Sequence, residues 1–179
     1  MRHPFMEQIA AALAERRIGT LRYEFPYMEK GGRSPDRPAV AVARVREAVA
    51  EAARVAPGVP LFAGGKSFGG RMTSTAQSGQ PLPGVLGLVF FGFPLHPPGK
   101  PGTERAAHLS SAGVPMLFLQ GTRDEFARLD LLEPLIESLG ASRHFVEGAD
   151  HSFRTRGRKA ADVVAELADA TEAWVTGNR

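Results

Sequence analysis

The sequence predicts an α/β fold, in which a mostly parallel sheet of about five strands is covered by helices on both faces. Two observations support this expectation. Short apolar or β-rich runs alternate with runs of helical periodicity along the chain, and polar residues suited to chemistry follow several of the expected strands, where open α/β sheets gather their functional groups. No internal repeat or linker divides the 179 residues, so we expect a single domain over residues 1–179.

The first third of the chain predicts two helices with one strand between them. Apolar residues recur at helical spacing over residues 4–17, with a proline in the first turn and Gly19 after the end. Residues 18–25 alternate and are β-rich, which predicts a strand, and the loop at residues 26–38 is rich in glycine and proline. A second helix then runs to about residue 56, and its expected buried stripe is Val42, Val45 and Val49.

From residue 61 onward, strands and helices alternate. Strands are expected at residues 61–63, 85–93, 115–120 and 144–147. Helices are expected after the turn at residue 67 and at residues 103–111, 126–139 and 163–174. A stiff, proline-rich loop at residues 94–102 leaves the sheet after the second of these strands. This alternation predicts a three-layer arrangement with helices on both faces.

The composition argues against several classes of protein. The chain has no cysteine, which excludes a disulfide scaffold and a thiolate metal site, and we expect the reducing cytoplasm as its location. The 22 basic residues are offset by 19 acidic ones, and the basic cluster at residues 154–159 lacks interleaved aromatics beyond Phe153, so no nucleic-acid partner is expected. The longest apolar run, residues 85–95, is too short to cross a bilayer, and we expect neither a signal peptide nor a membrane partner.

Residues 65–69 read G-x-S-x-G between an expected strand and an expected helix. This spacing forms a tight turn that strains the backbone of Ser67 and lifts its hydroxyl above the edge of the sheet. Side chains at Gly65 and Gly69 are expected to collide with the returning backbone. The helix that starts near Phe68 directs free backbone N–H groups at whatever is bound to Ser67, which suits a developing negative charge.

Two other interpretations of this turn remain open. The letters Gly-Lys-Ser resemble the end of a phosphate-binding G-x-x-x-x-G-K-[ST] loop. That nucleotide-binding loop needs a glycine where this chain has Pro60, and residues 61–63 are predicted as strand, so we favour it less. The second interpretation is a glycine-rich turn with a structural role alone. The partners available to Ser67 decide among them.

Candidate partners follow two of the later strands. A serine hydroxyl is a poor nucleophile until a base takes its proton, and the base needs a third group to hold its tautomer. Asp124 and His151 each come shortly after an expected strand. Taken singly, Asp124 could cap a helix and His151 could be a loop histidine. The order Ser67, Asp124, His151, with every member at a strand end, is the order of the α/β-hydrolase arrangement and favours a catalytic triad.

Other polar residues are weaker candidates. Glu125 is a reserve for the orienting acid. Asp150 is a poorer choice because it is the immediate neighbour of His151, so its side chain would tend to point elsewhere. The remaining histidines lack a matching cluster of carboxylates, and we therefore expect no metal site and no cofactor. They are His3, His96, His108 and His144.

Five segments together resemble a known family. They are Phe5-Met6, the residues Phe-Pro-Tyr-Met-Glu at 25–29, the glycine-rich turn at 64–71, the proline-rich segment 94–101 and Gln-Gly-Thr-Arg-Asp at 120–124. This set is similar to a bacterial α/β-hydrolase family related to dienelactone-hydrolase-like proteins and to a subunit of a eukaryotic histone acetyltransferase complex. The likeness covers nearly the whole chain. It implies an α/β-hydrolase fold and the same triad, but no settled substrate.

The resemblance also implies a departure from the family plan. The family carries several strands and a His-Gly-Ala-Gly-like loop before the first helix expected here, whereas this sequence starts at Met1 and is expected to be N-terminally truncated. One oxyanion donor would then be the N–H of Phe68, and the second would be missing unless a local N–H, near Tyr27, replaces it. The open sheet edge could be closed by pairing of residues 18–25 with 61–63, by a second copy in a homodimer, or by residues upstream.

Two functions of different classes follow. The first is a serine hydrolase of a small carboxylic ester or related acyl compound. In it Ser67 attacks the substrate, and His151 acts first as base and then as acid. Asp124 orients the imidazole of His151, and the Phe68 N–H holds the oxyanion. The second is a catalytically weak or inactive domain that keeps these residues but works by association.

Overall fold

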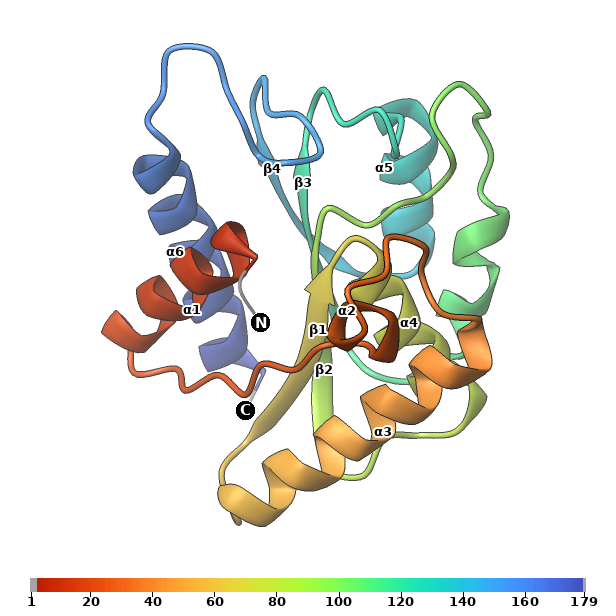
Figure 1. Ribbon diagram of the computed structural model, residues 1–179. Helices are drawn as coiled ribbons and strands as arrows, with labels where there is room; N and C mark the ends of the chain where they lie inside the picture. The colour runs from red at the N-terminus through yellow and green to blue at the C-terminus, as the bar shows by residue number, and fades with distance from the viewer. Residues whose placement is uncertain (1–2, 179) are drawn as a thin grey trace.

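Within residues 3–178, which the computed structural model describes, four parallel strands form a sheet with the spatial order β1-β2-β3-β4 (Figure 1). The strands are β1 (Leu61–Lys66), β2 (Val85–Phe91), β3 (Met116–Gly121) and β4 (Ser142–Val146). Each neighbouring pair is parallel. The carboxyl ends of all four strands therefore meet at one end of the sheet, where such folds place their functional groups. The strands expected from residue 61 onward are confirmed.

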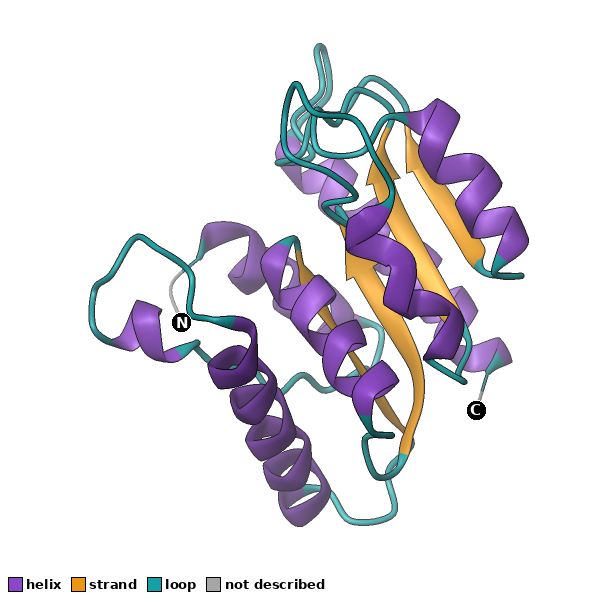
Figure 2. Ribbon diagram, turned by 90° about the vertical axis from the view of Figure 1, so that its right-hand side faces the viewer, coloured by secondary structure: helices purple, strands orange, loops and turns teal. Residues whose placement is uncertain are grey.

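Helices cover both faces of the sheet, as the alternation of elements predicts (Figures 1 and 2). On one face, α1 (Pro4–Glu15) and α6 (Ala160–Gly177) pack against each other. The other face carries α3 (Pro38–Val55), α4 (Phe68–Gly79), the 3-10 helix η1 (Glu104–Ser111) and α5 (Leu129–Ser138). A single turn, α2 (Pro26–Glu29), precedes α3. The result is the expected three-layer α/β architecture.

The two central strands supply two hydrophobic cores. Phe90 and Phe118 are fully buried and pack toward α3, α4 and α5. Val89 and Phe91, which flank Phe90 in β2, belong to the core formed with α1 and α6. Because successive side chains of a strand point to opposite faces, a central strand with helices on both sides needs apolar residues at every position. This explains the continuous apolar runs of β2 and β3.

Residues 18–25 do not form the expected strand, so the described sheet has four strands rather than about five. The segment leads from α1 on one face of the sheet to α2 and α3 on the other. Ile18 packs against the core of α1 and α6, whereas Tyr23 and Phe25 contact the opposite core. No residue of this segment pairs with β1, so pairing with residues 61–63, the first of the three ways considered for closing the sheet edge, is absent. Among the described residues, β1 pairs with β2 alone.

None of the helices between residues 3 and 178 combines the length and the apolar character that spanning a membrane requires.

Candidate active site

Ser67 lies at the sharp turn between β1 and α4. Its backbone has φ 50° and ψ −118°, a conformation that a residue with a side chain rarely adopts. The turn is held by two hydrogen bonds: the Ser67 N–H donates to the carbonyl of Phe91 (3.1 Å), and the Ser67 carbonyl accepts from the N–H of Arg71 (3.1 Å). The strained turn that the G-x-S-x-G spacing predicts is therefore present.

The glycines of the turn differ from the expectation at one position. A Cβ at Gly65 would lie 3.1 Å from backbone atoms of Gly69 and Gly70, a tight approach that favours glycine there, as expected. At Gly69 a Cβ would meet only the ring of Phe25 at 3.7 Å, which is an ordinary contact, and the expected collision is absent. The second close approach is at Gly70, whose Cβ would lie 2.7 Å from the carbonyl oxygen of Gly65. The helix packs on the strand through Gly65 and Gly70.

The three residues expected to act together form one hydrogen-bonded chain. The Oγ of Ser67 lies 2.8 Å from Nε2 of His151, and Nδ1 of His151 lies 2.7 Å from Oδ2 of Asp124. They follow β1, β4 and β3 respectively. In this arrangement the Nδ1–H of His151 donates to the carboxylate, and the free lone pair on Nε2 accepts from the hydroxyl of Ser67.

Asp124 is buried and receives further hydrogen bonds. Its Oδ1 accepts from the N–H of Phe126 (2.8 Å), and its Oδ2 accepts from the side-chain amide of Gln120 (2.5 Å) as well as from His151. Gln120 is itself fully buried and accepts from the N–H of Phe93 (2.8 Å). Gln120 is not among the site residues predicted from the sequence. The available signal was an uncharged polar residue near the end of an otherwise apolar strand.

The alternative acids do not contact the imidazole of His151 by any hydrogen bond in the described structure. The Oδ1 of Asp150 accepts from the N–H groups of Ser152 (2.8 Å) and Arg154 (2.9 Å), and so shapes the loop around His151. Glu125 is exposed. Asp124 is therefore the acid that the structure brings to the histidine.

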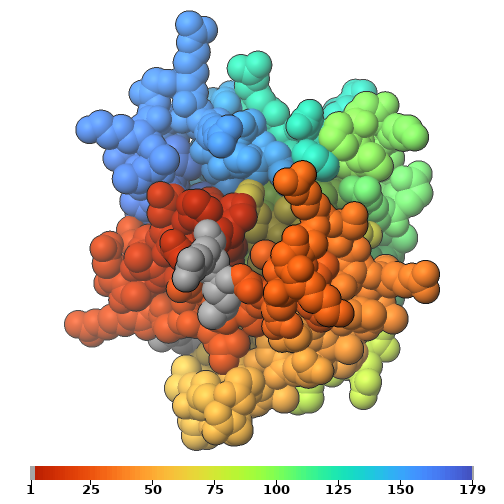
Figure 3. All heavy atoms as spheres, viewed as in Figure 1, coloured from red at the N-terminus to blue at the C-terminus, as the bar shows by residue number. Residues whose placement is uncertain are grey.

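His151 is one of the residues that line a surface cavity of about 340 Å³. Its walls include Arg123, Glu125, Phe126, Asp150 and Ser152. The ring of Phe126 lies against the imidazole, with centroids 4.3 Å apart. Figure 3 shows the yellow-to-olive region around β1 and α4 set back between the red N-terminal helix, an orange loop and the blue and teal loops that follow β4 and β3.

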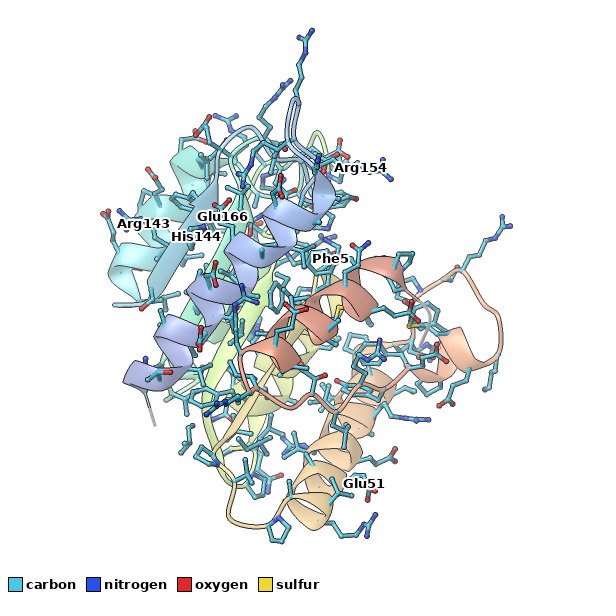
Figure 4. The ribbon with its side chains drawn as sticks, turned by 90° about the vertical axis from the view of Figure 1, so that its left-hand side faces the viewer. Phe5, Glu51, Arg143, His144, Arg154 and Glu166 are labelled. Atoms are coloured by element: carbon cyan, nitrogen blue, oxygen red, sulfur yellow. The ribbon has the colours of Figure 1, made fainter. Side chains whose placement is uncertain are left out.

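Lys66, the residue before the serine, also contacts His151 and was missed as a site residue. Its Nζ donates to the backbone carbonyl of His151 at 2.6 Å and lies 4.9 Å from the ring centroids of both Phe5 and Phe153. Figure 4 shows Phe5 near the start of α1. Burial lowers the pKa of Lys66 to about 8, although the carboxylates of Asp124 and Asp150 act in the opposite direction.

The backbone N–H of Phe68 lies in the first turn of α4, where amides have no partner within the helix. The ring of Phe68 packs edge-to-face on Phe25, with centroids 5.2 Å apart, and this contact orients the start of the helix. The N–H of Tyr27, considered as a substitute second donor, instead donates to Oδ2 of Asp36 (3.0 Å). The amide of Tyr27 itself is therefore already engaged.

Three of the other histidines have structural partners. These contacts are His96 Nε2 with the N–H of Arg128 (3.0 Å), His108 Nε2 with Oγ of Ser74 (2.8 Å), and His144 Nε2 with Oε1 of Glu166 (2.7 Å). His144 and Glu166 lie close together in Figure 4. In the part of the chain that the structure describes, no three histidine or carboxylate side chains are grouped so that they could hold a metal ion.

The fold is similar to several solved structures. An α/β serine hydrolase homologue from Coxiella burnetii superposes with a TM-score of 0.73 at 20% identity, over 97% of this chain and 76% of that protein. A lidless member of the α/β serine hydrolases from Xanthomonas campestris gives a TM-score of 0.74 at 20% identity, over 97% and 75%. The esterase domain of a Rhodothermus marinus protein gives 0.67 at 16% identity, over 95% and 79%.

These likenesses establish the fold. In sequence, residues 1–176 match the family described as "Alpha/beta hydrolase domain". Since the match covers almost the whole chain, the protein belongs to the α/β-hydrolase family.

Proposed function

We propose that the protein is a serine hydrolase that cleaves a small carboxylic ester, or a related acyl compound, through an acyl-enzyme. The observation that supports this most is the continuous hydrogen-bonded chain Ser67–His151–Asp124, at 2.8 and 2.7 Å, at a strained strand-to-helix turn. Each member has the chemistry its place requires: a hydroxyl on the half-buried turn, an imidazole between, and a buried carboxylate behind it.

Acylation starts at the hydroxyl of Ser67. Its Oγ attacks the carbonyl carbon of the ester while Nε2 of His151 takes the hydroxyl proton, and the imidazolium that forms is stabilised by Asp124. The tetrahedral intermediate then collapses, the carbon–oxygen bond to the leaving alcohol breaks, and His151 returns the proton to that alcohol. The acyl group remains esterified to Ser67.

Deacylation repeats these steps with water. His151 accepts a proton from the water, the resulting hydroxide attacks the acyl carbon, and the proton passes to Oγ as Ser67 leaves. In both halves the carbonyl oxygen becomes negative. The N–H of Phe68, in the first turn of α4, is the donor that we assign to it, with the helix N-terminus adding a partial positive charge.

We expect a small substrate and a site that is open to solvent. The cavity beside His151 is about 340 Å³ and lies at the surface. We assign the chain to the bacterial branch related to dienelactone-hydrolase-like proteins and to a subunit of a eukaryotic histone acetyltransferase complex, because the five quoted sequence segments resemble that branch. The lack of cysteine supports a cytoplasmic location.

A fluorophosphonate probe tests the proposal. The nucleophile displaces fluoride and forms a stable phosphonyl ester, which intact-mass measurement detects. We expect labelling of the wild-type protein and of Ser152→Ala, which removes an exposed hydroxyl from the wall of the same cavity. Ser67→Ala should remain unlabelled and should lose hydrolysis of short acyl esters. Labelling of Ser67→Ala at the wild-type rate would refute the assignment.

A second function is favoured by a separate observation. Among the described residues β1 pairs on one side only, and an unpaired strand edge can accept another strand. We therefore retain the interaction domain, with a homodimer through this edge, as the alternative. A well-folded wild-type protein that does not react with the fluorophosphonate, but dimerises in sedimentation experiments, would support it.

A further inference from the structure

Lys66 and Ser67 are consecutive residues that hold two different parts of the same histidine. Ser67 contacts the imidazole of His151, while the Nζ of Lys66 donates to the backbone carbonyl of His151 at 2.6 Å. Lys66 ends β1 and His151 follows β4, and two strands separate β1 from β4 in the sheet. The lysine therefore links the histidine loop directly to the strand that carries the nucleophile.

The ammonium group of Lys66 lies against two aromatic rings. Phe5 from α1 and Phe153 from the histidine loop are stacked, with centroids 5.4 Å apart and an interplanar angle of 14°. The Nζ lies 4.9 Å from each ring centroid. A cation is attracted to the faces of aromatic rings, and the attraction increases when water is removed. These ring contacts favour the position from which the ammonium group reaches the His151 carbonyl.

We propose that Lys66 is a positioning residue for the hydrolysis, which fixes the backbone of His151 so that Nε2 keeps its distance from Oγ of Ser67 during proton transfer. The proposal rests on the function proposed above. A hydrogen bond from a charged donor is stronger than a neutral one. Proton transfer depends steeply on geometry, and a displacement of about 1 Å can reduce a rate about a hundredfold.

The titratable groups around Lys66 determine when this contact operates. The carboxylates of Asp124 and Asp150, in the loops after β3 and β4, act on the charge of Lys66. The other titratable neighbours are His151, whose backbone carbonyl Lys66 binds, and His3, just before α1. Burial outweighs the two carboxylates and lowers the pKa of Lys66 to about 8. The ammonium form is thus present at neutral pH. As the pH rises through about 8 the charge is lost, and with it the charge-assisted hydrogen bond and the attraction to both rings.

Two substitutions separate the charge from the bulk of the side chain. Lys66→Met keeps an unbranched apolar chain but cannot donate, so we expect kcat to fall about 10- to 100-fold with little change in KM. Lys66→Arg keeps a permanently charged donor and should recover most of that loss. The wild type should lose rate as the pH rises through about 8, and this decrease should be absent in Lys66→Arg. Lys159→Met, at an exposed lysine before α6, is the matched control. A kcat for Lys66→Met within about twofold of wild type would overturn the proposal.

A second measurement needs no turnover. The Nδ1 proton that His151 shares with Asp124 should give a downfield, slowly exchanging proton NMR signal in the wild type and in Lys66→Arg, and this signal should be lost in Lys66→Met. An unchanged signal in Lys66→Met overturns the positioning role. Absence of Ser67 labelling in a wild type that shows the signal would instead refute the proposed function. If Lys66→Met fails to fold, Lys66→Gln, a neutral donor, is read in the same two assays and should show an intermediate loss.

Discussion

Gln120 donates its side-chain amide to Oδ2 of Asp124, the same oxygen that accepts the hydrogen bond from His151. The other end of this amide accepts from the N–H of Phe93. Gln120 therefore fixes the carboxylate from behind, and also satisfies the backbone where the chain leaves β2. Both roles are performed by one fully buried side chain.

Replacing Gln120 by leucine should affect stability and rate together. The substitution leaves the Phe93 N–H without its partner and removes one donor from the carboxylate, so we expect a loss of about 1–3 kcal/mol in the free energy of unfolding. We also expect a decrease in kcat of about tenfold, because Asp124 is less firmly held. Urea denaturation and ester hydrolysis measure the two effects. Gln80→Leu, at an exposed position after α4, should change neither, and equal effects of both variants would contradict this role.

Asp124→Asn tests the orienting acid. An asparagine amide at this position would favour the wrong tautomer of His151, so kcat should fall by about four orders of magnitude while the fold is retained. Glu125→Gln, an adjacent and exposed carboxylate, should leave kcat within about twofold of wild type. Circular dichroism checks the folded state of both proteins. If Glu125→Gln were the more damaging change, the acid would have been wrongly assigned.

The backbone of Ser67 stores strain that a substitution can release. At φ 50° and ψ −118° a Cβ is unfavourable, whereas glycine adopts this region freely. Ser67→Gly should therefore unfold with a free energy about 1 kcal/mol higher than Ser67→Ala, and both should be inactive. Thermal denaturation of the two variants measures the difference. Equal stabilities would show that the turn imposes no such cost.

Gly69 and Gly70 are neighbours with opposite expectations. A Cβ at Gly70 would lie 2.7 Å from the carbonyl oxygen of Gly65, so Gly70→Ala must separate α4 from β1, at a cost of about 1–3 kcal/mol. Gly69 has room for a methyl group, and alanine favours the helix by up to about 1 kcal/mol. Chemical denaturation should rank Gly69→Ala at or above wild type and Gly70→Ala well below it. The reverse order would contradict the packing described.

His108 should make the protein less stable in acid. Burial, with a smaller effect of the Arg71 charge, lowers its pKa below 6.5. The unfolded chain then binds the proton more readily than the folded one, so this contribution to stability is complete above about pH 6.5 and decreases as the pH falls below it. His108→Gln cannot titrate and should lose less stability than wild type between pH 7.5 and 5.5, measured by urea midpoints. Parallel losses in both proteins would exclude His108 as the cause.

The sequence predicts the strands from residue 61 onward and the hydrogen-bonded residues Ser67, Asp124 and His151, because each depends on a local signal. A continuous apolar run marks a buried strand, and the place where it ends marks the functional end of the sheet. Residues 18–25 have the local character of a strand, but in the structure they connect α1 and α3 on opposite faces without joining the sheet. Local propensity does not report where a segment must travel.

Lys66 shows a second feature that the sequence does not predict, which is a contact between residues far apart in the chain. Its contact with the carbonyl of His151 joins residues 85 positions apart, and nothing near Lys66 in the sequence indicates it. A lysine beside a nucleophile is just as consistent with a solvated surface charge. The difference between Gly69 and Gly70 has the same origin, because the distance from a helix to its strand is a property of tertiary packing.

The pairing of α1 with α6 sets an order of events during synthesis. The buried face of α1, formed by Phe5, Ile9 and Leu13, packs in a core that includes residues of α6. A ribosome delivers residues 4–15 well before residues 160–177. The nascent chain must therefore keep the apolar face of α1 uncovered by α6 while the intervening strands emerge. During that interval the uncovered apolar face is prone to aggregation, and packing against α6 removes that exposure.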